Sequence, residues 1–164
     1  MDDKKIPYPE LDGIREDEKT LKIVSPAYAG DESELTAVLQ YTYQAILLGE
    51  TGHKDLAETL KKISMDEMRH VEILGRLVTK LGARPVFSYF PPYPIRFFTA
   101  RSVSYSSSPK KMLADSIVGE QYAIDSYSRM IAKLTDESVR AVIARIRMDE
   151  MKHLQMLEEA VKSL

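Results

Sequence analysis

The ten residues MDEMRHVEIL, at positions 65–74, are nearly repeated as MDEMKHLQML at positions 148–157. Each copy places a glutamate three positions before a histidine: Glu67 and His70, then Glu150 and His153. Residues three apart share one face of an α-helix, so each copy presents a carboxylate and an imidazole together. Both groups are ligands for divalent transition metals. The repeat therefore indicates a metal site built from two similar halves.

A second pair of glutamates extends the duplication. Glu34 begins ELTAVLQY and Glu120 begins EQYAIDSY, and both segments fit the pattern E-x-x-A-[VI]-x-x-Y. Glu34 precedes Glu67 by 33 residues, and Glu120 precedes Glu150 by 30 residues. The two separations differ by about one helical turn, which a loop can absorb. Each half of the chain thus contains a single glutamate followed by a Glu-x-x-His pair.

These polar residues lie on the apolar stripes of their segments. Glu67 follows Ile63 by four residues, and His70 precedes Leu74 by four. Glu150 follows Ile146 in the same way. A buried, unpaired carboxylate costs several kcal/mol or more, so compensating positive charge is needed.

Two divalent ions would supply that charge. The cationic side chains near the motifs fall on other helix faces: Arg69, Arg147 and Lys152. Two ions of charge +2 balance four carboxylates, and the two imidazoles give each ion one nitrogen ligand. Oxygen-rich donors with a single nitrogen favour iron or manganese. The predicted ligands are Glu34, Glu67, His70, Glu120, Glu150 and His153. Solvated side chains on a salt-rich surface are the alternative, but they would not require the flanking apolar residues to repeat.

Four long segments with helical periodicity position these residues. They run over about 31–48, 54–80, 109–134 and 135 to the end. Gly82 is the expected stop of the second helix, Ser108-Pro109 opens the third, and Thr135-Asp136 opens the fourth. Ser25-Pro26 offers an earlier, alternative start of the first helix.

Short connections within each pair of helices predict two antiparallel hairpins. The segment 82–108 between them is long and contains all four phenylalanines. We expect an all-α four-helix bundle over 27–164, made of two antiparallel hairpins, in which this segment is the single long crossover between helices 2 and 3. Its aromatic residues would attach it to the bundle or to a partner subunit, or it is simply an ordered apolar loop. Residues 1–26 would form an arm on the bundle, with room for one short helix.

Composition excludes several functional classes. The 164 residues include no cysteine, which excludes disulfides, thiolate zinc sites, iron–sulfur clusters and cysteine nucleophiles. The net charge of −2 does not suggest a nucleic-acid or membrane-surface partner. The N-terminal stretch has no apolar signal-peptide core, and no segment approaches the roughly 18 apolar residues of a membrane span. We therefore expect a cytoplasmic protein.

The six predicted ligands resemble those of the ferritin-like superfamily of di-iron and di-manganese carboxylate proteins, over about residues 27–164. The stretches SELTAVLQY and MDEMRH are similar to bacterioferritins. SPAYAGDESELTAVLQYTYQ and the crossover resemble manganese-catalase-like and short rubrerythrin-type proteins.

The resemblance implies a role for each ligand. Glu67 and Glu150 would bridge two metal ions, whereas Glu34 and Glu120 would each bind one ion. His70 and His153 would also bind one ion each.

Further residues come with the resemblance. Tyr41 and Tyr127 would hydrogen-bond the ligand carboxylates, with core packing as the alternative. Asp66 and Asp149 would orient the histidine of a neighbouring helix, with solvated side chains as the alternative.

The implied reactions use peroxide or dioxygen. The favoured interpretation is peroxide detoxification, similar to manganese catalase or rubrerythrin, by an enzyme with two iron or manganese ions. Ferroxidase activity with iron storage and a non-enzymatic, metal-loaded structural subunit are the alternatives. Two features depart from rubrerythrins: a cysteine-ligated module is absent, and Ala123 stands where those proteins tend to carry an extra glutamate. A rubrerythrin-like reaction would need an external electron donor, whereas a catalase-like cycle needs none. A homodimer or larger homo-oligomer is expected.

Overall fold

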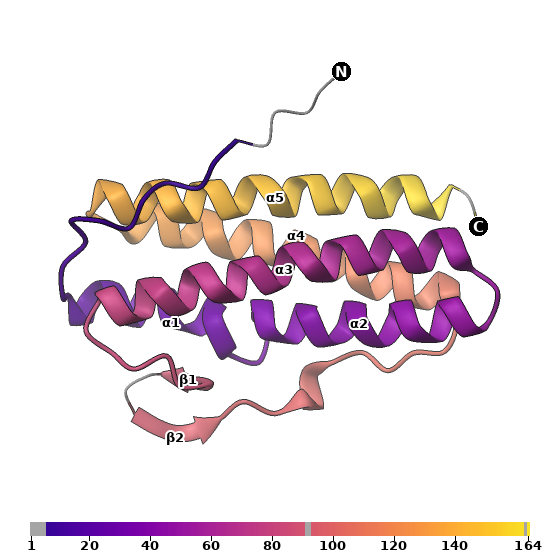
Figure 1. The fold of residues 1–164 in the computed structure, drawn as a ribbon, viewed down its shortest axis with the longest axis horizontal. Helices are drawn as coiled ribbons and strands as arrows, with labels where there is room; N and C mark the ends of the chain where they lie inside the picture. Colours follow the sequence, from indigo (N-terminus) through magenta and orange to yellow (C-terminus); the bar gives the residue numbers. More distant parts are fainter. Residues whose placement is uncertain (1–5, 91–92, 163) are drawn as a thin grey trace.

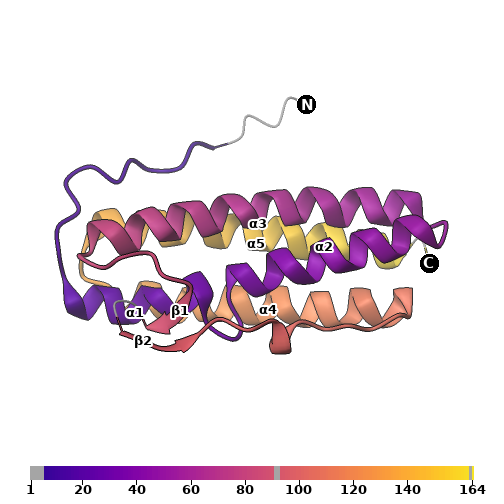
Figure 2. The same cartoon turned by 60° about the horizontal axis from the view of Figure 1, so that its bottom comes forward.

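A computed structural model describes residues 6–90, 93–162 and 164. Helix α2 (Glu34–Glu50) and helix α3 (Lys54–Lys80) form one antiparallel hairpin, and α4 (Pro109–Lys133) and α5 (Glu137–Val161) form the other. The two hairpins pack along their lengths (Figures 1 and 2). This arrangement confirms the predicted four-helix bundle of two antiparallel hairpins, with a long crossover between its halves. Residues 1–5 of the predicted arm and 91–92 of the predicted crossover lie outside the described residues.

An additional helix, α1 (Glu18–Ala29), precedes the bundle hairpins. Helix α1 lies roughly in line with α2, and the two together run along α3 (Figure 1). The Asp17 side chain caps α1 by accepting from the backbone N–H of Lys19. Pro26 lies inside the last turn of α1, so the alternative start of the first bundle helix at Ser25-Pro26 is wrong. Helix α1 ends at Ala29, and α2 begins at Glu34, three residues later than predicted.

The other helix boundaries follow local signals. Gly82 adopts φ +100° just after the C-cap of α3, a conformation that glycine reaches without steric cost. Asp136 caps α5, because its side chain accepts from the backbone N–H of Val139. Pro109 is the first residue of α4, as predicted. Ser108 occupies the N-cap position but makes no capping hydrogen bond with its side chain.

The crossover contains structure that the sequence did not predict. Strand β1 (Ser88–Phe90) pairs antiparallel with β2 (Tyr93–Phe97), and a short 3-10 helix, η1 (Ala100–Ser102), follows. Tyr28 of α1 stacks on Phe87 at a ring-centroid distance of 5.5 Å and donates a hydrogen bond to the carbonyl of Pro85. Gly75 of α3 permits this packing, because a Cβ there would lie 3.2 Å from the Tyr28 ring. An aromatic contact therefore ties the crossover to the helices.

The hydrophobic core is divided into two clusters along the bundle. One cluster includes the later turns of α3 and the first turns of α5, together with α1 and residues of the arm. The other includes the early turns of α3, the start of α4 and the end of α5. Along α3, α4 and α5, a layer of buried polar residues separates the clusters. Within the described residues, no helix is both long and apolar enough to cross a membrane.

Candidate metal centre

The buried polar layer contains all six predicted ligands, supplied by all four bundle helices. None is more than 5% exposed. Glu34 comes from the first turn of α2 and Glu120 from the middle of α4, while α3 and α5 each contribute a Glu-x-x-His pair. The structure brings six side chains together in this layer: Glu34, Glu67, His70, Glu120, Glu150 and His153.

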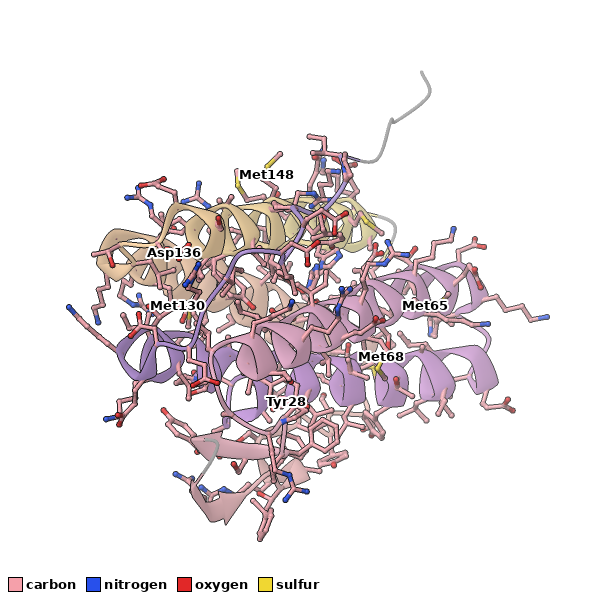
Figure 3. All side chains as sticks on the ribbon, turned by 60° about the vertical axis from the view of Figure 1, so that its left-hand side comes forward. Tyr28, Met65, Met68, Met130, Asp136 and Met148 are labelled. Atoms are coloured by element: carbon pink, nitrogen blue, oxygen red, sulfur yellow. The ribbon has the colours of Figure 1, made fainter. Side chains whose placement is uncertain are left out.

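The methionines of the repeated decapeptides mark the exposed face of each helix, opposite the Glu-x-x-His pairs. Met65 and Met68 of α3 are 66% and 52% exposed, and Met148 and Met151 of α5 are 39% and 53% exposed. Figure 3 shows Met148 projecting from α5 away from the bundle. Each repeated decapeptide thus directs its methionines outward and its Glu-x-x-His pair into the core, as the 3.6-residue helical period requires.

Carboxylate oxygens converge on one ring nitrogen of each histidine. His70 Nδ1 lies 2.8 Å from an oxygen of Glu67, 2.9 Å from one of Glu150 and 3.3 Å from one of Glu34. His153 Nδ1 lies 3.1 Å from Glu67, 3.3 Å from Glu150 and 3.9 Å from Glu120. A ring nitrogen can donate one proton at most, so it cannot satisfy three carboxylates by hydrogen bonding.

Glu67 and Glu150 each reach both histidines with different oxygens. Glu67 directs Oε2 at His70 and Oε1 at His153. Glu150 directs Oε1 at His70 and Oε2 at His153. Two groups of candidate ligand atoms, each within 4.8 Å of one another, therefore share both of these glutamates. Glu34 belongs only to the group of His70, and Glu120 only to the group of His153.

Two buried tyrosines hold the unshared glutamates from the opposite helix. Tyr41 of α2 donates a hydrogen bond to Oε1 of Glu120 on α4, and Tyr127 of α4 donates to Oε1 of Glu34 on α2. Oε2 of each glutamate remains directed at a histidine. The exchange follows the internal repeat, because the two tyrosines occupy equivalent positions in the duplicated pattern.

The outer ring nitrogen of each histidine faces an aspartate of the other Glu-x-x-His helix. His70 Nε2 lies 3.4 Å from Asp149, and His153 Nε2 lies 3.8 Å from Asp66. A proton on Nε2 that points to the aspartate leaves the lone pair of Nδ1 facing the carboxylates. The two aspartates thus lie where they can fix the ring orientation.

Sequence reasoning missed two residues next to Asp149. Arg145 is 4% exposed, and its Nη1 lies 2.6 Å from Asp149 Oδ2. Its position four residues before Asp149 on the same helix is a sequence signal for this ion pair. Tyr8, from the N-terminal arm, donates a hydrogen bond of 2.5 Å to the same oxygen. Nothing local in the sequence indicates that contact, because 141 residues separate the partners.

The cluster strongly perturbs its own ionisation. Burial raises the pKa of Glu34, and the charges of Glu150 and Glu67 raise it further. Burial and the same two charges also raise the pKa of Glu120. Burial by itself lowers the pKa of His70, but the charges of Glu150 and Glu34 raise it well above its usual value. The chain alone therefore neutralises the cluster with protons, which divalent ions can replace.

A cavity of about 730 Å³ reaches the four carboxylates from the side of α2, α4 and the crossover. Figure 2 shows the crossover running along this side of the bundle. Small or polar residues such as Ala37, Ala123 and Ser126 form part of the wall. Of the residues that the structure describes, no lysine, arginine or histidine lines the cavity, but seven acidic residues do: Asp31, Glu32, Glu34, Glu67, Asp115, Glu120 and Glu150. The cavity therefore favours neutral or cationic molecules over anions.

Comparisons with known proteins agree with this architecture. A model of the ferritin-like domain family matches residues 32–164, which include all six candidate ligands. A curated bacterioferritin from Desulfovibrio desulfuricans is 36% identical over 73 residues, or 44% of this chain and 40% of that protein. The match thus spans less than half of the curated relative.

Solved structures show the same fold. A manganese catalase from Anabaena superposes with a TM-score of 0.80 at 20% identity, covering 98% of this chain and 78% of that chain. A Desulfovibrio desulfuricans bacterioferritin described with a diiron site superposes with a TM-score of 0.73 at 23% identity, covering 88% and 78%.

Proposed function

Since this chain belongs to the ferritin-like domain family, we propose that it is an oxidoreductase that binds two iron or manganese ions and acts on hydrogen peroxide or dioxygen. The observation that supports this proposal best is the way in which Glu67 and Glu150 each offer one oxygen to each histidine. Carboxylates in that arrangement can bridge a pair of ions.

The donor set fits two metal ions. Glu120 Oε2 and Glu150 Oε1 are buried and have no hydrogen-bond partner among the described residues. Leaving such acceptors unsatisfied is costly, whereas an ion would satisfy them. One ion would be held by Glu34, His70 and the two shared glutamates, and the other by Glu120, His153 and the same two glutamates. Carboxylates with one imidazole per ion suit iron or manganese.

When bound, two such ions supply a pair of metals that exchange two electrons with peroxide or dioxygen. The chain itself fixes the geometry around them. Tyr41 and Tyr127 orient Glu120 and Glu34, while Asp66 and Asp149 face the outer nitrogens of the histidines. The core clusters on either side of the layer along the bundle are apolar, so that charges between them interact strongly.

The cavity supports a reactive centre over a structural one. A purely structural metal site would be closed, whereas here a cavity of about 730 Å³ leads to all four carboxylates. Hydrogen peroxide is small and uncharged, so the acidic lining does not repel it. Peroxide disproportionation also needs no separate electron donor, because peroxide serves as both oxidant and reductant. We therefore favour peroxide removal.

Ferrous oxidation is the second candidate. The acidic lining of the cavity would attract Fe²⁺ as a substrate, although Asp31 and Asp115 are already ion-paired, and the curated relative is a bacterioferritin. Storage of the oxidised iron would follow in this case.

A direct assay separates the candidates. The protein should be loaded with Mn²⁺ or Fe²⁺, and oxygen evolution from hydrogen peroxide should be recorded without added reductant. Oxygen evolution supports disproportionation, peroxide loss only with a reductant supports a peroxidase, and rapid catalytic oxidation of excess Fe²⁺ supports a ferroxidase. A protein that binds two ions and shows none of these activities would contradict the proposed oxidoreductase function.

A further inference from the structure

The two histidines of the metal centre have unequal surroundings. Asp149, beside His70, has a side chain that is 5% exposed. Asp66, beside His153, has a side chain that is 33% exposed and lies farther from its histidine. Its neighbour Arg69 is 3.9 Å away and 48% exposed. Water therefore competes for Asp66 but much less for Asp149, although the two occupy equivalent places in the internal repeat.

The N-terminal arm packs against the Asp149 side of the centre. Figure 1 shows the arm crossing α5 before it reaches α1. Arg145 Nε donates a hydrogen bond of 2.8 Å to the carbonyl of Ile6, and its guanidinium lies 4.4 Å from the ring centroid of Tyr8. Leu11 and Ile14 anchor the arm, because they are 4% and 7% exposed in the hydrophobic core. The arm is thus packed in place where it passes His70.

Tyr8, Arg145 and His70 converge on one oxygen of Asp149. Tyr8 Oη lies 2.5 Å from Oδ2, Arg145 Nη1 lies 2.6 Å from it and His70 Nε2 lies 3.4 Å from it. The edge of the Tyr8 ring also faces the His70 ring at a centroid distance of 6.3 Å. The carboxylate is therefore fixed from three directions, and the arginine balances its charge.

We propose that Tyr8 is a positioning residue that, with Arg145, holds Asp149 against His70 and makes the ion position at His70 the tighter of the two. The inference rests on the proposed metal centre. A fixed Asp149 accepts the Nε2 proton of His70, so the Nδ1 lone pair stays directed at the ion. Buried hydrogen bonds of this kind are stronger than exposed ones, so the His153 position gains less from Asp66.

The test is a titration with Mn²⁺ in which free ion is measured by electron paramagnetic resonance. Two single-position variants separate the sites: His153→Ala keeps the His70 position, and His70→Ala keeps the His153 position. His153→Ala should bind its ion more tightly than His70→Ala does. Adding Tyr8→Phe should weaken binding about three- to ten-fold in the His153→Ala protein, somewhat less than the roughly 10- to 100-fold typical of losing a direct partner of a ligand. The same change should leave the His70→Ala protein unaltered.

Two matched variants complete the design. Tyr43→Phe is the control for a tyrosine hydroxyl, because Tyr43 donates only to crossover carbonyls, and it should change neither affinity. Asp149→Asn alters the same arrangement without touching the arm, and it should weaken only the His70 position. Circular dichroism and thermal unfolding report whether each protein is folded.

Equal affinities of the two single-position variants would overturn the proposal. So would a Tyr8→Phe effect of the same size at both positions, or no effect at the His70 position. The proposed reaction fails in a different way: wild-type protein that binds two Mn²⁺ ions with unequal affinity but neither consumes peroxide nor oxidises iron would refute the reaction and keep the role of Tyr8.

Discussion

Six side chains from four helices are arranged so that no internal hydrogen bond can satisfy them all. Each histidine Nδ1 faces three carboxylate oxygens. Two of these oxygens, Glu120 Oε2 and Glu150 Oε1, accept no hydrogen bond from the described residues. The cost of such a layer in a hydrophobic core is large without compensating cations. At the scale of single residues, the proposed chemistry therefore requires that two metal ions balance the charge of the glutamates.

Loss of a shared glutamate tests this balance. Glu67→Ala or Glu150→Ala should lower the metal content from two ions per chain to one or none, because each of these residues belongs to both ligand groups. Mass spectrometry of the metal in purified protein measures the outcome. Glu158→Ala, at an exposed position of α5, is the control and should retain two ions. Two ions per chain in either test variant would contradict the assignment.

The tyrosines should behave differently from the glutamates. Tyr41→Phe removes a hydrogen bond to Glu120 but no ligand atom, so the metal content should stay close to that of the wild type. The same metal analysis measures it. A complete loss of metal from the folded variant would show that the hydroxyl does more than orient the carboxylate.

Metal binding should also depend on pH. The pKa values of Glu34 and Glu120 are raised, chiefly by burial, so these carboxylates hold protons in the metal-free protein up to a higher pH than free glutamate does. Divalent ions must displace those protons, and hence binding should release protons and weaken as the pH falls. Calorimetry in buffers of different ionisation enthalpy measures the release. Binding that strengthens on acidification would contradict this account.

At the scale of elements, four helices must hold their register for the layer to form. Helix α5 supplies both Glu150 and His153, and the side chain of Asp136 caps its N-terminus (labelled in Figure 3). The break between α1 and α2 places Glu34 in the first turn of α2. The residues at which the helices begin and end therefore determine where along the bundle axis each ligand lies.

Removal of the α5 cap should lower stability without removing a ligand. Asp136→Ala should reduce the free energy of unfolding by about 1 kcal/mol, a typical value for loss of an N-cap side chain. Chemical denaturation measures the change. Asp125→Ala, at an exposed position within α4, is the control and should not destabilise the protein. A cap variant as stable as the wild type would show that Asp136 does not support the helix.

At the scale of the whole molecule, the two core clusters and the cavity determine what reaches the centre. Both sides of the layer along the bundle are apolar, and the cavity between α2 and α4 supplies a route to the carboxylates. Access therefore depends on the residues that line this cavity rather than on the ligands alone.

A larger side chain in the cavity should slow the reaction while leaving the metals in place. Ala123 lines the cavity and is partly buried, so Ala123→Leu should lower kcat/KM for peroxide several-fold at unchanged metal content. Oxygen evolution and metal analysis on the same sample measure both. Ala132→Leu, at an exposed position of the same helix outside the cavity, is the control. Unchanged activity in the Ala123 variant would place the access route elsewhere.

Sequence periodicity and duplication were sufficient to predict the helices and to select the six residues of the layer. The long segments around Glu67 and Glu150 carry strong local signals, because apolar residues recur on one face and capping residues mark the ends. The metal-binding roles remain predictions, although the structure places the side chains together. The sequence did not predict the β-hairpin of the crossover or the bounds of helix α1, since short strands and a helix containing Pro26 have weak local signals.

The sequence by itself thus determined which residues face the core and how they repeat, since both follow from the helical period. Only the tertiary structure decided which partners meet across helices: Tyr41 with Glu120, Tyr127 with Glu34, and Tyr8 with Asp149. These contacts join residues 79 to 141 positions apart. Their geometry depends on the packing of whole helices and of the arm, and no local pattern in the chain specifies that packing.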